Sequence, residues 1–469
     1  MPLILPGNVA SATGGGYEVA NSCRFNQPDS PYMSKTHGSA GNQRTFTVSF
    51  WYKRMKTGTN DIVMTTTDGG SSFLSIAILG GGTYINKLQF YWYDGSTDYG
   101  YHSARLFRDF SAWYHVVFAV DTTQGTASNR IKLYINGTQE TLTATYGAFP
   151  QNHDAYFNKD NVHYIGYDHD SAGAWLNGYL AEVVVLDGTA ASPTSFGEFD
   201  EDSPTIWKPI DVSGLTFGTN GFYLDFEDSS NLGNDANGGT DWTESNLAAA
   251  DQCTDTPTNN FCTLNPLAKG SSAYTFTEGN CIGLANAADW NGAVGTFGVE
   301  NGKWYWEIKL VSADADGNNF FGVCGEAVHN YLHQTNVQDS TTGHVLWALE
   351  GEISINNTHT GSYFNTKATN DIFGIALDLD SGTQTIQFYR NGSTDGSAAN
   401  IPSNMQSGFI FPHFVGNSSA ETATFQCNFG NPSFSISSGN ADANGYGNFE
   451  YAVPSGFYAL CTKNLAEYG

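Results

Sequence analysis

The sequence predicts an all-β protein built from two antiparallel β-sandwich domains. Runs of β-branched and aromatic residues alternate with Gly, Asn, Asp and Thr turn residues along most of the chain. The composition includes 53 Gly, 25 Tyr and 31 Phe, a balance that suits short strands and tight turns. A chain of 469 residues is too long for one hydrophobic core, so we expect two domains.

A polar stretch in the middle of the chain, residues 221–267, divides the two domains. It reads as a short β element at 222–226 followed by about forty residues rich in Asn, Asp, Gly, Thr and Pro. We expect a first domain at residues 1–210, a Gly/Asn/Asp-rich connector at 211–270 and a second domain at 271–469. Because the connector is too polar to form a core alone, we expect it to lie across one or both sandwiches.

The charge of the chain disfavours nucleic acids and anionic membranes as partners. The formal net charge is −27, and 27 of the 46 acidic residues but only 6 of the 19 basic residues follow residue 210. Binding to phosphates depends on Lys and Arg, which this chain holds in small number. The start of the sequence lacks the basic region of a secretory signal, and no run approaches the 18 apolar residues of a membrane helix. We therefore expect a soluble protein without membrane insertion.

The seven cysteines are widely scattered and show no metal-binding spacing. They are Cys23, Cys253, Cys262, Cys281, Cys324, Cys427 and Cys461. We expect buried free thiols, as in a reducing cytoplasm; the alternative is a disulfide framework, for which Cys253 and Cys262 form the one near pair.

Strand and turn signals begin at Phe46 and continue to about residue 188. The predicted strands are TFTVSFWYKR, DIVMTTT, SFLSIAIL, KLQFYWYDG, WYHVVFAVDTT, RIKLYINGTQ, VHYIGYD and GYLAEVVVLDG. In RIKLYINGT, alternation places Ile131 and Leu133 on one face and Lys132 and Tyr134 on the other. The following Asn-Gly pair supplies a hairpin turn.

The order of FTVSFWYKR, WYHVVFAVDTT, IKLYINGTQ and HYIGYDHDSAGAWLNGYLAEVVVLDG resembles the laminin-G and concanavalin-A-like jelly roll over residues 20–210. Upstream, NSCRFNQPDSPYMSKTHGSAGNQRTFTVSFWYKR resembles the opening of virion proteins of tailed phages of the marine type. The first resemblance implies a jelly-roll domain that often carries Ca²⁺ on its rim and binds glycans or proteins there.

Three aspartates are candidate Ca²⁺ ligands in this domain: Asp121 at a strand end, and Asp168 and Asp170 in the YDHDSAG loop. Their carboxylates are the hard oxygen ligands that Ca²⁺ prefers. The alternative interpretation is that these aspartates start turns by accepting hydrogen bonds from their own backbone.

Tyrosines in LQFYWYDGSTDYGYHS form a candidate platform for sugars. If Leu88, Phe90 and Trp92 point inward, the two tyrosines between them point outward. The candidate ligand contacts are Tyr91 and Tyr93, with Tyr99 and Tyr101 in the following loop. Aromatic rings bury area against a sugar ring and keep a polar tip. A second packed layer or a subunit interface explains the same pattern.

Closely spaced acidic residues, Glu198, Asp200 and Asp202, stand after the last predicted strand of the first domain. On a strand they would share one face, as the acid and nucleophile of a polysaccharide depolymerase require. Because they lie between Pro193 and Pro204 with little apolar alternation, we interpret them as a solvated loop.

Strand signals resume after Ser271. The segments GKWYWEIKL, FFGVCGEA, DIFGIALDLDSGTQTIQFYRNG and FIFPHFVGNSSAETATFQCNFG occur in the order of a SPRY (B30.2) domain, which they resemble over residues 300–435. The resemblance implies a binding module that contacts partners through loops at one end. The connector and the tail YAVPSGFYALCTKNL again resemble the phage proteins.

Histidines and a tyrosine gather in the predicted loop AVHNYLHQTNVQDSTTGH. The candidate contacts are His329, Tyr331 and His333, followed by His344. They can form a partner or metal surface, or can simply be exposed loop residues. We expect the tryptophans of this domain, Trp304, Trp306 and Trp347, in the core rather than in a platform.

No local signature of a catalytic site survives, so we expect a protein that is not an enzyme. The resemblance to virion proteins of tailed phages implies a structural protein of a phage virion, made in the bacterial cytoplasm. Its expected task is adhesion, as a tail-fibre or head-fibre component that binds glycans or proteins of the host surface. The alternatives are a capsid decoration or adaptor protein without a host ligand, and the depolymerase. Other virion proteins are expected partners. No heptad stretch is present, so a homo-oligomer, with a trimer favoured, would assemble through sandwich faces.

Overall fold

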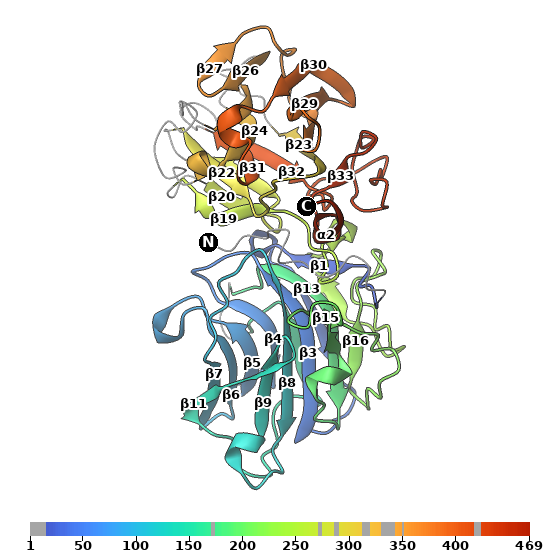
Figure 1. The fold of residues 1–469 in the computed structure, drawn as a ribbon. Coiled ribbons are helices and arrows are strands. Elements are labelled where there is room, and N and C mark those ends of the chain that lie inside the picture. The colour runs from blue at the N-terminus through green and yellow to red at the C-terminus, as the bar shows by residue number, and fades with distance from the viewer. Residues whose placement is uncertain are drawn as a thin grey trace. The chain divides into compact units, whose positions relative to one another are not determined.

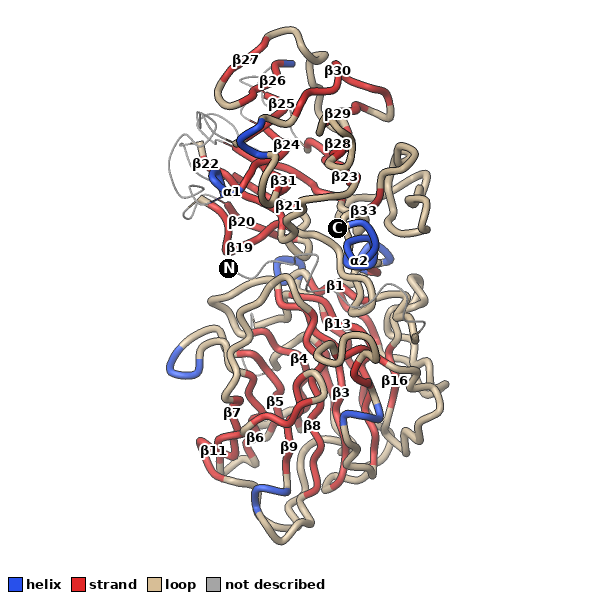
Figure 2. The backbone as a smooth tube through the Cα atoms, viewed as in Figure 1, coloured by secondary structure: helices blue, strands red, loops and turns tan. Residues whose placement is uncertain are grey.

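The computed structural model is all-β, and it divides into two compact units, one ending at Thr258 and the other spanning Asn259–Gly469 (Figure 1, Figure 2). The structure describes residues 16–169, 174–270, 274–285, 290–311, 319–329, 343–348, 351–416 and 424–469. The α-helices among these residues are the short α1 (Glu326–His329) and α2 (Thr462–Tyr468). Within the described residues, no helix has both the length and the apolar character needed to cross a membrane.

The first unit is a sandwich of two antiparallel sheets. In strand order, sheet 1 consists of β10 (Thr138–Glu140), β9 (Ile131–Ile135), β8 (Trp113–Asp121), β3 (Thr45–Arg54), β13 (Gly178–Asp187), β1 (Ser22–Phe25) and β18 (Gln252–Cys253), with β16 (Phe222–Leu224) also paired to β13. The long strand β3 lies between β8 and β13, as Figure 1 shows.

Sheet 2 forms the other layer of this sandwich. In strand order it consists of β11 (Leu142–Gly147), β7 (Asp98–Ser103), β6 (Leu88–Tyr93), β5 (Phe73–Ile78), β4 (Asp61–Thr67), β12 (Val162–Ile165), β2 (Tyr32–Thr36) and β17 (Thr243–Ser245). Strands β4 to β7 follow one another both along the chain and across the sheet, which is a meander of short hairpins.

The inward side chains of the two sheets form the core of the first unit. In β6, Leu88, Phe90 and Trp92 are buried while Tyr91 and Tyr93 between them are half-buried, so the predicted alternation is confirmed. In β9, Ile131, Leu133 and Ile135 are buried and the residues between them are half-buried, which confirms the prediction for that strand too. Both patterns follow from the two-residue period of a strand.

The predicted connector contributes strands to the first sandwich. Strand β16 pairs with β13, β17 with β2, and β18 with β1. The connector thus lies along the first sandwich, and the boundary between the compact units at Thr258 falls inside it. Its buried side chains, which include Phe222, Leu232 and Trp242, join the core of the first unit, so this stretch needs no core of its own.

A second apolar layer covers the outer face of sheet 1. A short hairpin of β14 (Gly197–Phe199) and β15 (Trp207–Pro209) brings Trp207 onto Trp51, Trp113 and Tyr179. Further along the sheet, residues that follow β13 pack in the same way: Phe196, Val212 and Phe217 contact Val117, Val184 and Leu186.

The second unit is also a sandwich. In strand order, sheet 3 consists of β19 (Leu264–Lys269), β22 (Asn291–Gly295), β31 (Ile410–Gly416), β24 (Asn319–Gly325), β25 (His344–Ala348), β26 (Glu352–Ile355) and β27 (Thr358–Thr360). Sheet 4 consists of β20 (Tyr274–Thr277), β21 (Ile282–Ala285), β32 (Thr424–Asn428), β23 (Lys303–Leu310), β28 (Ile372–Asp378), β29 (Thr385–Arg390) and β30 (Ser393–Asn400), with β33 (Tyr458–Ala459) parallel to β23.

The core of this unit holds the predicted tryptophans. Trp304, Trp306 and Trp347 are each at most 1% exposed, which confirms that they are core residues. All seven cysteines of the chain are free and buried, as predicted. The chain after sheet 4 packs back on its outer face, where buried Glu307 accepts hydrogen bonds from the backbone N–H groups of Glu450 and Tyr451 at 2.9 and 2.8 Å.

Candidate functional site

Aromatic side chains follow one another across the outer face of sheet 2. We call six of them the aromatic band: Phe73, Tyr84, Tyr91, Tyr93, His102 and Tyr146. Phe73 lies on β5, Tyr91 and Tyr93 on β6, His102 on β7 and Tyr146 on β11. Tyr84 belongs to a single 3-10 turn, Gly82–Tyr84, between β5 and β6. Ring centres are 5.5 Å apart for Phe73 and Tyr91 and 5.6 Å apart for Tyr91 and Tyr146.

Strand register places these rings side by side. Tyr91 lies opposite Ser75 of β5 and Gly100 of β7, so a small residue flanks it on each side. A Cβ atom on Gly100 would come within 2.6 Å of the Tyr146 ring. Gly100 therefore leaves the space in which Tyr146, from the edge strand β11, leans over β7 toward Tyr91.

The rings of the band differ in exposure, and their polar groups are held in place. Tyr146 is 51% exposed, Tyr91 and Tyr93 are half-buried, and His102 is only 1% exposed. The Tyr91 hydroxyl donates a hydrogen bond to Asp98; burial and this bond raise the pKa of Tyr91 above its ordinary value. His102 stacks on Tyr84 with ring centres 3.9 Å apart and bonds Thr145 Oγ1 at 2.7 Å. Fixed rings with few free rotamers bind at a low entropic cost.

A second aromatic cluster lies on the same face, on the other side of β4. It consists of Tyr32, Tyr164, Tyr167 and Trp175, with ring centres 5.1 to 6.0 Å apart. The Thr65 hydroxyl of β4 donates to the Tyr167 carbonyl at 2.8 Å, which holds the loop after β12 against the sheet. His169 of that loop contacts Phe73 at 5.4 Å between ring centres, so the loop joins the cluster to the aromatic band.

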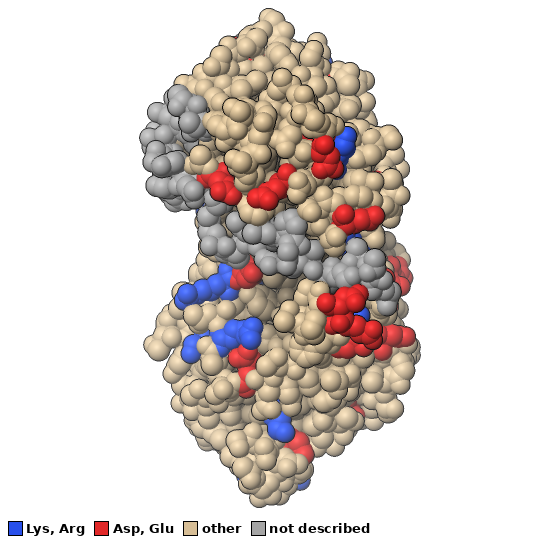
Figure 3. All heavy atoms as spheres, in the orientation of Figure 1, with Lys and Arg blue, Asp and Glu red and all other residues tan. Residues whose placement is uncertain are grey.

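The strands of this face present no basic side chain. The register and alternation of β2, β4, β5, β6, β7 and β12 put no Lys or Arg at an outward position of these strands. The charges that contact the band are Lys87, whose Nζ lies 5.9 Å from the centre of the Tyr84 ring, and Asp98, which accepts the hydrogen bond of Tyr91. Figure 3 shows small groups of Lys and Arg and of Asp and Glu among uncharged side chains on the side of the molecule that it draws. The face therefore suits a neutral ligand that offers apolar CH groups and hydroxyls rather than phosphate or sulfate.

Two of the four predicted tyrosines do not lie where the sequence placed them. Tyr99 and Tyr101 belong to β7 rather than to a loop, and they point inward. Tyr101 is 5% exposed and its hydroxyl accepts a hydrogen bond from the Phe149 N–H at 3.0 Å; Tyr99 packs on Trp92 at 5.3 Å. The Gly, Ser and Asp residues of this segment suggest a turn, but pairing on both sides with β6 and β11 makes it a strand.

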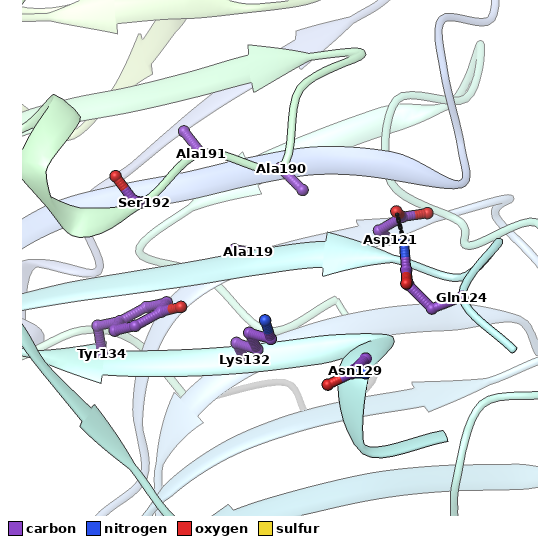
Figure 4. Close-up of a pocket in the computed structure, with 9 residues that line it drawn as sticks. All are labelled: Ala119, Asp121, Gln124, Asn129, Lys132, Tyr134, Ala190, Ala191 and Ser192. Atoms are coloured by element: carbon purple, nitrogen blue, oxygen red, sulfur yellow. Dashed lines mark hydrogen bonds between the residues drawn. The ribbon is translucent and has the colours of Figure 1, made fainter. Parts of the chain in front are cut away.

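A shallow polar pocket lies on the outer face of sheet 1 (Figure 4). Its volume is about 350 Å³. It is lined by Ala119, Asp121, Gln124, Asn129, Lys132, Tyr134, Ala190, Ala191 and Ser192. Figure 4 shows Lys132 and Tyr134 on one strand facing the Ala190–Ser192 stretch, with Asp121 and Gln124 at one end.

The described candidate ligands do not come together as a Ca²⁺ site. Asp121 Oδ1 accepts hydrogen bonds from the Thr123 N–H at 3.0 Å and hydroxyl at 2.5 Å, and Oδ2 accepts one from Gln124 at 2.6 Å. Although burial acts to raise it, these bonds lower the pKa of Asp121. Asp168 follows β12 of the other sheet, and Asp170 lies outside the described residues. In the part of the chain that the structure describes, no three His, Cys, Asp or Glu side chains could hold a metal ion together.

The predicted histidine loop of the second unit is described only at its ends. His329 closes α1, its side chain is not described, and Tyr331 and His333 lie outside the described residues. His344 is not a loop residue: it is buried in β25 and its Nε2 lies 3.2 Å from Ser354 Oγ. Burial lowers the pKa of His344 to about 4, so it is neutral at physiological pH.

The three acidic residues after the first domain are placed by a hairpin. Glu198 and Asp200 lie 3.5 and 3.6 Å from Lys208 Nζ, so they are near one another. Asp200 is 4% exposed and caps its own turn through the N–H groups of Asp202 and Ser203, which corrects the prediction of a solvated loop for this residue. Asp202 is an exposed loop residue, as predicted. Both carboxylates pair with Lys208, which is the arrangement of a structural ion pair.

A buried serine and a buried histidine form a hydrogen bond on the covered outer face of sheet 1, a pairing that also occurs in serine hydrolases. Ser49 Oγ lies 2.9 Å from His115 Nε2, and the Trp207 Nε1–H donates to His115 Nδ1 at 2.9 Å. Since Nδ1 accepts this bond, the neutral ring carries its proton on Nε2 and donates it to Ser49. A nucleophilic serine needs the opposite arrangement, with the histidine as acceptor. Burial lowers the pKa of His115 to about 3.

Two family models match the chain. A laminin-G model described as the concanavalin A-like lectin/glucanases superfamily matches residues 29–194, and a SPRY domain model matches residues 303–432. Together with the two sandwiches, these matches define the chain as a laminin-G/concanavalin-A-like domain followed by a SPRY domain.

Among curated proteins, the chain is similar to the ATP-dependent RNA helicase DDX1 of Xenopus laevis, with 25% identity over 171 residues. That similarity covers 36% of this chain and 21% of the helicase, so this chain spans about a fifth of the relative's length.

Solved structures give distant similarities. The SPRY domain of human HERC1 has 16% identity and a TM-score of 0.29, with 35% of this chain and 96% of that chain covered. A putative carbohydrate binding protein from Bacteroides ovatus has 18% identity and a TM-score of 0.34, covering 49% and 59%. Domains LG4-5 of the mouse laminin α1 chain have 10% identity and a TM-score of 0.33, covering 91% and 92%.

Proposed function

We propose that this chain is a non-enzymatic adhesin that binds a neutral glycan on the outer face of sheet 2. The aromatic band carries the proposal, because the partly exposed rings of Phe73, Tyr91 and Tyr146 on neighbouring strands form a surface on which sugar rings can stack. The match to the concanavalin A-like lectin/glucanases superfamily over this domain is consistent with carbohydrate binding.

We further propose that the protein works on the outside of a tailed-phage particle, where it touches the host surface. This part rests on the resemblance of the opening segment, the connector and the tail to phage virion proteins. A homo-oligomer, with a trimer favoured, would present several such faces at once and raise avidity without new contacts. Light scattering on the purified protein tests the oligomeric state, and a monomer would contradict it.

The test is binding of the fluorescently labelled protein to candidate host cells. Saturable binding that is lost after periodate oxidation of the cells supports a glycan ligand. If a well-folded protein binds no cells, the band is better explained as a contact with other virion proteins, which is the capsid-decoration or adaptor alternative.

Two tyrosine variants locate the surface. Tyr91→Ala removes a ring from the aromatic band, and we expect affinity to fall about tenfold, or ~1.4 kcal/mol. Tyr134→Ala is the matched control, because Tyr134 is also a half-buried, outward tyrosine of a sandwich strand but lines the pocket on sheet 1. A larger loss with Tyr134→Ala would move the glycan site to that pocket.

A further inference from the structure

A lysine and an aspartate touch one another under the cover of sheet 1. Lys53 Nζ lies 2.6 Å from Asp255 Oδ2, and both side chains are 0% exposed. Lys53 belongs to β3 and its neighbours across the sheet are Trp113 and Tyr179. The Trp113 Nε1–H donates to the other carboxylate oxygen, Asp255 Oδ1, at 2.9 Å. The aromatic side chains of Trp113 and Tyr179 thus lie beside the ion pair of Lys53 and Asp255.

We propose that Lys53 and Asp255 condense to an amide, which makes this contact a covalent cross-link within the chain. A proton first moves from the ammonium to the carboxylate, giving an amine and a carboxylic acid without any proton from outside. The amine nitrogen then attacks Asp255 Cγ, and the new N–C bond replaces the C–OH bond. The hydroxyl leaves with one amine proton as water, so no oxidant, reductant or other reagent is needed.

Three features of the site favour each step. Both side chains are 0% exposed, so bulk water is kept away from the amine and the carboxyl group. The Trp113 N–H points at Oδ1, where negative charge develops when the nitrogen adds to the carbonyl carbon. The contact also holds the two groups together, and such intramolecular reactions reach effective molarities of about 10⁵–10⁸ M.

The position of the contact gives the cross-link a role. Lys53 and Asp255 are 202 residues apart in the chain, and Asp255 follows the last connector strand of the first unit, β18. An amide there would tie the end of the connector to the central strand of sheet 1. A protein exposed to pulling forces or to unfolding conditions gains from such a bond because it persists when the fold opens.

Intact mass of the denatured wild-type protein tests the proposal. We expect a mass below that of the sequence by one water molecule, and a proteolytic peptide in which residue 53 is joined to residue 255. An unmodified mass, or separate peptides that carry an unmodified Lys53 and Asp255, would overturn the proposal.

A matched variant controls for other losses of water. Asp-Gly pairs such as Asp94-Gly95 also lose water when they cyclise, which gives the same mass change. Lys53→Arg keeps the positive charge but lacks the primary amine, so we expect it to have the full mass. If Lys53→Arg shows the same loss as the wild type, the water comes from elsewhere and the cross-link is absent.

Discussion

Both sheets of the first sandwich carry aromatic side chains on their outer faces, but these side chains are covered on sheet 1 and partly exposed on sheet 2. On sheet 1, outward Trp51, Trp113 and Tyr179 are at most 7% exposed because Trp207 and the chain around it cover them. On sheet 2, outward Tyr91 and Tyr93 stay half-exposed. An aromatic outward face is therefore not by itself a binding surface. It becomes one where the rest of the chain leaves it open.

Polar contacts hold the chain segments that cover the outer face of sheet 1, which we call the cover. Lys53 pairs with Asp255, and His115 links Ser49 to Trp207. Glu182, on β13, accepts hydrogen bonds from the hydroxyls of Tyr223 at 2.8 Å and Tyr17 at 3.2 Å. Asp255, Trp207 and Tyr17 lie outside the strands of sheet 1, so polar contacts as well as apolar packing hold the covering segments on the sheet.

The largest expected effect comes from breaking the Lys53–Asp255 contact. Asp255→Ala leaves a buried lysine and the Trp113 N–H without this partner, and we expect the first unit to lose about 3–5 kcal/mol of unfolding free energy. Urea unfolding measures it. Asp211→Ala is the control, since Asp211 is an exposed residue of the same covering chain. Equal stability of the two variants would show that the contact does not hold the cover.

The buried carboxyl group of Glu182, on the covered face of sheet 1, should make the free energy of unfolding depend on pH. Burial raises the pKa of Glu182 from 4.5 to about 8, so the folded protein keeps a proton that the unfolded chain releases. Unfolding free energy contributed by this group therefore falls as pH rises from 4.5 to 8. We expect Glu182→Gln, which has no proton to lose, to gain stability relative to the wild type over this window.

Urea unfolding at about pH 5 and about pH 8.5 measures this difference. Glu201→Gln changes an exposed carboxylate of the same unit and serves as the control. A difference between Glu182→Gln and the wild type that stays constant with pH would mean that the cover does not bury an uncharged Glu182.

A smaller effect is expected at the open face. Tyr146→Ala removes an exposed ring at the edge of the aromatic band, so we expect stability to change by less than about 0.5 kcal/mol. Binding to host cells should fall by a few-fold, because the ring borders Tyr91. A large loss of stability without a loss of binding would show that Tyr146 is a packing residue and does not belong to the binding surface.

No effect is expected from metal removal. Asp121 already accepts three hydrogen bonds, and no metal cluster is found among the residues that the structure describes. Cell binding should therefore be the same with and without EDTA. Loss of binding in EDTA would instead restore Asp121, Asp168 and Asp170 as candidate Ca²⁺ ligands.

Much of the fold was predictable because its signals are local. The alternation in 88–93 and 131–135 placed each side chain on the correct face, and the tryptophans of the second unit were assigned to the core from strand patterns alone. The predictions failed where partners are distant. Tyr99 and Tyr101 lie in a strand because β6 and β11 pair with it, and His344 is buried by its place in sheet 3.

The candidate site was predictable only in part. Sequence pattern identified Tyr91 and Tyr93, but Phe73 joins them through strand register, Tyr146 through the space at Gly100 and Tyr84 by stacking on His102. The sequence by itself determined which side of strands such as β6 and β9 faces outward, because this follows from a two-residue period. Tertiary structure alone decided which outward face meets solvent, because residues up to about two hundred positions away, such as Trp207 and Asp255, cover one sheet and leave the other open.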